Sequence, residues 1–96
     1  MSEQQLELKV INSPTIMIRL IEIIKRRRIR IKLFLGEECP DEADDALVRV
    51  VVYADEERVR LLKSQFEKQI EVITVKTAGL APQCHLPTIQ NYPDNL

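Results

Sequence analysis

The stretch LELKVINSPTIMIRLIEII, residues 6–24, decides the fold that this sequence predicts. Its first half alternates apolar and polar residues, which predicts a half-buried strand over residues 5–11. Its second half places apolar residues at helical spacing from Ile16 to Ile24, which predicts an amphipathic helix. Ser13 is the expected N-cap of this helix and Pro14 its first residue. The stretch therefore predicts a strand that turns directly into a helix.

The turn between this strand and this helix is the first candidate for a binding site. Backbone amides in the first turn of a helix lack partners inside the helix, and the helix dipole favours negative charge there. One interpretation is a ligand or partner held by Asn12, Ser13, Pro14, Thr15 and Ile16, and the other is a capped helix start without a ligand. From the residues alone, both interpretations stay open.

The remaining chain continues the pattern of strands and helices. Alternation over residues 29–35 predicts a second strand, with Ile29, Ile31 and Leu33 toward the core. An acidic loop, residues 36–45, leads to a β-branched third strand whose composition suits a central position. The third strand is expected over residues 47–53. Asp55 is expected to cap a second helix, whose apolar face would contain Val59, Leu62, Phe66 and Ile70. A fourth strand is expected over residues 71–76.

The order βαββαβ predicts an α+β, ferredoxin-like domain. Right-handed crossovers place both helices on one face of a four-stranded antiparallel sheet with the strand order 4-1-3-2. The 96 residues suffice for one such domain, expected over residues 1–77, followed by a Pro-containing tail over residues 78–96.

Composition narrows the class of protein. Only two glycines are present, and no glycine-rich phosphate loop occurs, so no nucleotide cofactor is expected. No apolar run approaches the ~18 residues of a membrane helix, and the first residues lack a signal-peptide core. Cys39 and Cys84 do not form a disulfide framework. These features predict a cytoplasmic protein that does not contact a membrane.

The strongest local charge is basic and lies around the predicted second strand. Arg26, Arg27, Arg28 and Lys32 form a candidate surface for a protein partner or a second copy, and a solvated or edge-guarding face is the alternative. Nucleic acid is disfavoured because RNA-binding domains of this fold stack bases on sheet aromatics, which are scarce here. The acidic loop lacks the spacing of a calcium-binding loop, and the Cys84-His85 pair would need two more zinc ligands where only Cys39 remains, so no metal is expected.

Several motifs resemble those of ACT domains, and most closely those of the short regulatory (small) subunit of acetolactate synthase. The resemblance spans about residues 6–75 and rests on Asn12-x-Pro14 with Ile16-Met17 and Arg19-Leu20, on the pair Arg26-Arg27, and on Gln65-x-x-Lys68-x-x-x-Val72-Ile73-x-Val75. It implies a non-catalytic partner of the thiamine-diphosphate-dependent large subunit in branched-chain amino-acid synthesis. It also implies a homodimer paired through the strand-two edges, with an amino-acid effector bound at that interface against the first turn.

The sequence departs from the family at the expected effector contacts, which are residues 12–16 with Arg30 and Ile31. Thr15 replaces a glycine that lets backbone approach the effector, and Arg30 replaces a short asparagine on the second strand. Arg28 stands at a helix end that usually holds a small residue. The resemblance therefore implies a subunit that is weakly sensitive or insensitive to valine.

Other functions on this fold remain as alternatives. The chain is also compatible with a stand-alone ACT domain that senses a small amino acid, or with an RNA-binding module. An acylphosphatase-type enzyme needs an anion-cradling loop with arginine, which residues 12–15 do not provide. A metallochaperone needs C-x-x-C in that loop. No catalytic residues are expected.

Overall fold

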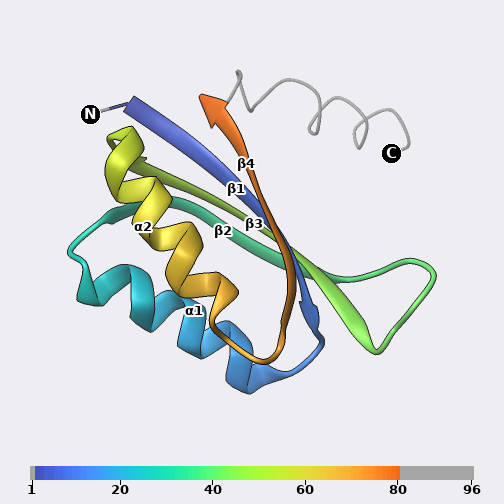
Figure 1. Ribbon diagram of the computed structural model, residues 1–96. Coiled ribbons are helices and arrows are strands. Elements are labelled where there is room, and N and C mark those ends of the chain that lie inside the picture. Colours follow the sequence, from blue (N-terminus) through green and yellow to red (C-terminus); the bar gives the residue numbers. More distant parts are fainter. Residues whose placement is uncertain (1, 81–96) are drawn as a thin grey trace, which may run out of the picture.

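The fold is a four-stranded antiparallel sheet with two helices on one face (Figure 1). The computed structural model describes the backbone of residues 2–80 and the side chains of residues 2–77. The sheet order β2-β3-β1-β4 confirms the predicted ferredoxin-like βαββαβ fold, with β3 in the centre and β2 at one edge. The elements are β1 (Ser2–Ile11), α1 (Pro14–Arg26), β2 (Arg30–Glu38), β3 (Asp45–Ala54), α2 (Glu56–Glu67) and β4 (Val72–Leu80).

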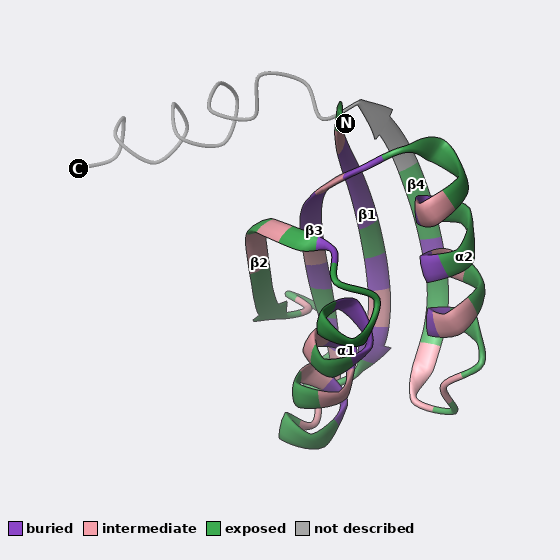
Figure 2. Cartoon of the chain, turned by 90° about the vertical axis from the view of Figure 1, so that its left-hand side faces the viewer, coloured by how far each residue is buried: buried purple, intermediate pink, exposed green. Residues whose placement is uncertain are grey.

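The core lies between the sheet and the helices. Alternate residues of β1 and β3 face the helices, and Figure 2 shows the buried bands along both strands. Burial of each such aliphatic side chain contributes about 1.5–3 kcal/mol, so this layer holds the helices on the sheet. The core includes Leu6, Leu8 and Val10 of β1, Val48, Val50 and Val52 of β3, Ile16, Leu20, Ile23 and Ile24 of α1, and Val59, Leu62 and Phe66 of α2.

β1 is longer than its apolar pattern predicts, and β4 is longer with it. Gln4 and Gln5 are buried, and their amides donate hydrogen bonds of 3.0 Å to Ser2 and Glu7. β4 continues to Leu80, opposite Gln4, so residues 78–80 extend the strand instead of starting the predicted tail. The rest of that tail, residues 81–96 with the Cys84-His85 pair, lies outside the described residues.

The observed helix boundaries agree better with the predicted caps than with the spacing of apolar residues. Asp55 caps α2 by accepting from the backbone N–H of Arg58 at 2.8 Å, as the sequence predicts. The helix ends at Glu67, and Ile70 is 92% exposed, so its predicted place in the core is wrong. Within the described residues, no helix is long and apolar enough to cross a membrane.

A β-bulge in β2 changes which residues face the core. Ile31 lies opposite Val52 but Leu33 lies opposite Val51, so Lys32 is the extra residue in the bulge. Phe34, together with Ile31, packs against the core, while Leu33 lies on the open face of the sheet. The prediction that Leu33 faces the core is therefore wrong, because simple alternation does not count the bulged residue.

Candidate functional site

The turn between β1 and α1 is built as the sequence predicts. Ser13 has extended backbone (φ −146°, ψ 136°), and its Oγ accepts from the backbone N–H of Thr15 at 3.1 Å. Pro14 begins the helix and has no N–H to offer. Thr15 is exposed, whereas Ile16 is fully buried and belongs to the core. The cap therefore uses one of the amides that a ligand could contact.

Asn12 is bound to the loop between β2 and β3. Its backbone N–H donates to the carbonyl of Asp44 at 2.8 Å, and its side-chain amide donates to the carbonyl of Ala43 at 2.9 Å. The same amide lies 3.4 Å from a carboxylate oxygen of Glu38. An effector that used the Asn12 side chain would have to replace these bonds.

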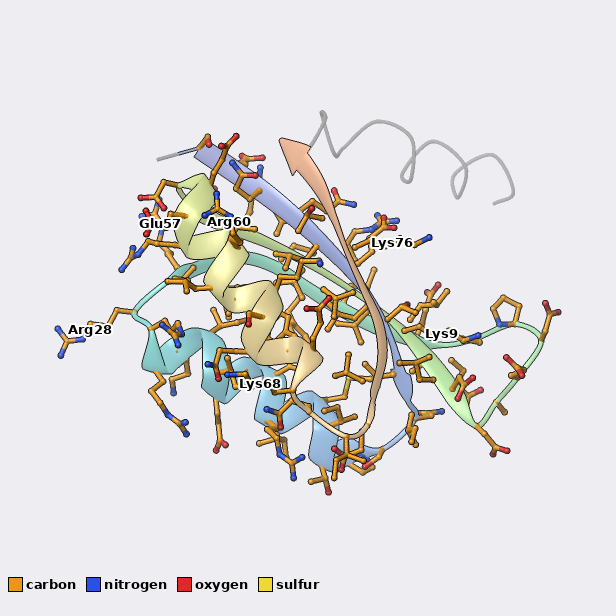
Figure 3. All side chains as sticks on the ribbon, viewed as in Figure 1. Lys9, Arg28, Glu57, Arg60, Lys68 and Lys76 are labelled. Carbon is orange, nitrogen blue, oxygen red and sulfur yellow. The ribbon has the colours of Figure 1, made fainter. Side chains whose placement is uncertain are left out.

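An ion pair holds the same loop against the end of β1. The Lys9 ammonium lies 3.3 Å from Glu42 and 3.7 Å from Asp45, and Figure 3 shows Lys9 at the base of this loop. The hydrogen bond to Glu42, with the charge of that carboxylate, raises the pKa of Lys9 above its usual 10.5. A raised pKa means that the folded protein favours the charged form of Lys9. The contribution of this ion pair to stability is therefore fully present below pH 10.5, and it is lost only as the pH rises through the raised pKa of Lys9.

Arg30 and Ile31, the other expected effector contacts, lie at the far end of β2. Arg30 is opposite Tyr53, with its guanidinium carbon 4.4 Å from the ring centroid, and Ile31 packs against the core. Asn12 contacts Glu38, which lies seven ladder positions beyond Arg30 in β2, and seven positions span about 23 Å. One chain therefore keeps the two groups of predicted contacts apart.

The basic residues gather where α1 passes into β2. Arg28 has φ 58°, its N–H donates to the carbonyl of Lys25, and the N–H of Ile29 donates to the carbonyl of Ile24. This pair of bonds is the Schellman ending, whose left-handed position glycine favours. Arg58 of α2 donates to the carbonyl of Arg27 at 3.3 Å.

We call Arg28, Arg30, Tyr53 and Arg58, which line one hollow here, the basic corner. Figure 3 shows the Arg28 side chain extending away from the molecule. Arg26 and Arg27 are exposed on the same turn, and Lys32 pairs with Glu3. Within residues 2–77, no carboxylate forms an ion pair with Arg28, Arg30 or Arg58.

The described surface offers little for other chemistry. No three side chains of the metal-binding types His, Cys, Asp and Glu gather within the described residues. Tyr53 is the one aromatic residue on the described open face, because Phe34 and Phe66 pack on the helix side, and Arg30 already lies over its ring. A base-stacking platform of the RNA-binding type would need further aromatics in these strands.

Comparison of the sequence with protein-family models and with curated proteins finds no match. Among solved structures, the ACT domain of GTP pyrophosphokinase from Chlorobium tepidum aligns with a TM-score of 0.66 at 10% identity, covering 79% of this chain and 96% of that chain. This chain has the ACT-domain fold. The resemblance seen in the sequence motifs is therefore confirmed at the level of the fold.

Two further structures with this ACT-domain fold come from Thermotoga maritima. The small subunit of acetolactate synthase aligns with a TM-score of 0.72 at 21% identity, covering 80% of this chain and 47% of that chain. The chain thus spans about half the length of that subunit. An uncharacterized protein aligns with a TM-score of 0.66 at 20% identity, covering 82% of this chain and 96% of that chain.

Proposed function

We propose that this chain is a non-catalytic regulatory small subunit of acetolactate synthase, acting in the cytoplasm on a thiamine-diphosphate-dependent large subunit. The observation that carries the proposal is the ACT-domain fold, in which the resembling motifs fall at the start of α1, the end of α1 and the α2–β4 connection. The match to a solved small subunit supports it. In this proposal the catalytic residues belong to the large subunit.

A homodimer paired through the two β2 edges is part of the proposal. β2 is an edge strand, and it leaves Leu35 44% exposed on the open face. Edge strands present unpaired backbone N–H and C=O groups that a second strand satisfies. Antiparallel pairing would bring the start of one β2 to the end of the other. Arg30 and Ile31 of one copy would then approach Asn12 of the second copy, completing an effector site that one chain leaves divided.

The proposed subunit is weakly sensitive or insensitive to valine. The Asn12 amide is already bound to the β2–β3 loop, and Thr15 adds a side chain where an effector needs close approach to the backbone. Arg30 lies over Tyr53, so an effector at this position would have to displace it. Each of these features raises the free energy of effector binding.

The surface proposed for the large subunit is basic. Arg26 and Arg27 are exposed at the end of α1, beside Arg28, while Lys32 of β2 pairs with Glu3. Clustered cations favour an acidic surface on the partner and speed association more than they raise affinity. The matching large subunit is therefore expected to present carboxylates to this turn.

Binding to the large subunit tests the proposal. Titration calorimetry of the acetolactate synthase large subunit of the same organism should give a saturable complex with this chain. The double variant Arg26→Glu/Arg27→Glu should weaken the complex about tenfold or more, since each mispaired rim charge costs up to about 1 kcal/mol. Lys76→Glu, a single charge reversal on exposed β4, is the control and should leave affinity unchanged. A large subunit that does not bind the wild-type chain would contradict the proposal.

A stand-alone ACT domain that senses a small amino acid is the second candidate. One observation favours it: the uncharacterized Thermotoga maritima protein has a similar fold over 96% of its own chain. Saturable binding of an amino acid by the chain alone, with no affinity for the large subunit, would select this candidate.

A further inference from the structure

β2 carries opposite charges at its two ends. It begins with Arg30, at the basic corner, and it ends with Glu37 and Glu38. The middle of the strand is apolar, with Leu33, Phe34 and Leu35 in succession. A strand of this kind complements a second copy of itself only when the two run antiparallel, because parallel pairing would set Arg30 beside Arg30 and Glu37 beside Glu37.

The bulge fixes which side chains share a face. Ile31, Phe34 and Gly36 lie opposite residues of β3 that face the helices, whereas Arg30, Leu33, Leu35 and Glu37 lie opposite residues of the open face. Lys32 and Leu33 together occupy one position in the ladder. Two paired strands keep one continuous core only if residues that face each other share a face, so these assignments restrict the register.

We infer that two copies pair through β2 in an antiparallel register centred on Phe34, so that Arg30 of each copy meets Glu37 of the other. The inference rests on the proposed dimer and adds its register. Counting outward from Phe34, Leu35 meets the bulged pair Lys32 and Leu33, Gly36 meets Ile31, and Glu37 meets Arg30. Every one of these pairs shares a face. Shifting one strand by one ladder position would place helix-facing residues opposite residues of the open face. Shifting it by two positions would keep the faces together but would separate Arg30 from Glu37.

The charges around Arg30 support this register. Arg28 and Arg58 line the same hollow as Arg30, and none of the three has a carboxylate partner within residues 2–77. Glu37 is exposed and forms no ion pair within the same residues. In the inferred register, Glu37 of one copy enters the basic corner of the other. By symmetry the contact forms twice, and the apolar centre of the two strands lies between the two contacts.

A charge-swap experiment tests this register. The dissociation constant of the dimer is measured by sedimentation for the wild type, Arg30→Glu, Glu37→Arg, the double variant, and an equimolar mixture of the two single variants. Each single variant creates two like-charge contacts and should raise the dissociation constant about tenfold. The double variant and the mixture each restore two opposite-charge contacts, so both should return to near the wild-type value. Lys76→Glu, on the opposite edge strand, is the matched control and should leave the value unchanged.

The outcomes separate the register from the dimer itself. A wild-type chain that stays monomeric at high concentration would overturn the proposed pairing and the register with it. A dimer that tolerates the single variants as well as it tolerates Lys76→Glu would retain the pairing and overturn the register. Single variants that weaken the dimer without recovery in the mixture would also overturn it, because Arg30 and Glu37 would then not face each other.

Discussion

Arg28 is held in a backbone conformation that suits glycine better than arginine. Its φ of 58° lies in the left-handed region, and for a residue with a side chain this conformation costs about 1 kcal/mol. The two hydrogen bonds of the helix ending and the burial of Ile29 hold it there. A strained residue that also extends its charge into solvent is better explained by a contact with a partner than by the stability of the fold.

Replacing Arg28 by glycine should therefore stabilise the fold and weaken the dimer. Arg28→Gly is expected to raise the free energy of unfolding of the monomer by about 1 kcal/mol. Urea unfolding followed by circular dichroism at two protein concentrations separates the monomer from the dimer. Sedimentation should show a larger dissociation constant for the dimer, since the basic corner loses one cation. A variant that is no more stable than the wild type would contradict the strain assigned to this position.

Ser13 offers a second test at the scale of one residue. Ser13→Ala removes the acceptor of the Thr15 N–H and should cost about 1 kcal/mol of stability. Thr15→Ala, next to it, removes an exposed side chain with no hydrogen bond of its own in the described residues, and should change stability by less than about 0.5 kcal/mol. Thermal unfolding of the two variants side by side measures the difference, and equal losses would argue against the cap.

At the scale of elements, the bulge in β2 decides the faces of that strand. Residues 29–35 alternate so regularly that they predict Leu33 in the core. Because Leu33, Phe34 and Leu35 are all apolar, the sequence does not show which of them faces the core after the bulge. The bulge instead places Leu33 on the open face and Phe34 toward the helices. Strand pairing with β3 determines this outcome, and no periodicity within β2 alone reveals it.

A matched pair of substitutions tests the face assignment. Phe34→Gln places a polar amide against the core and should lower the free energy of unfolding by roughly 2 kcal/mol or more. Leu33→Gln changes a residue of the open face and should cost less than about 1 kcal/mol in the monomer. Urea unfolding at low protein concentration keeps the dimer from contributing. The reverse order of the two losses would show that β2 has no bulge in solution.

The element boundaries also show where sequence patterns succeed. Caps predict the helix starts because Ser13 and Asp55 act through local hydrogen bonds. The first three residues of β1, residues 2–4, are missed because they are polar, although Gln4 is buried and its amide donates a hydrogen bond to Ser2. Ile70 is misplaced because the helical spacing continues past the point where α2 ends.

At the scale of the whole molecule, the fold follows from the order of elements, but the site does not. The resemblance to ACT domains groups Asn12 with Arg30 as effector contacts, and the structure separates them along β2. The bond from Asn12 to Ala43 joins residues 31 positions apart, so no local pattern predicts it. In the proposed dimer, a second copy of the chain would bring the two groups of contacts together.

The most direct test of the proposed regulatory role is the rate of acetolactate formation by the large subunit of the same organism, measured as this chain is titrated in, with and without valine. A regulatory subunit with weakened effector contacts should raise the rate until it saturates, and valine should leave the saturated rate unchanged. No activation at saturating chain would contradict the proposed function. Activation that valine abolishes would keep the regulatory role and contradict the effect assigned to Asn12, Thr15 and Arg30.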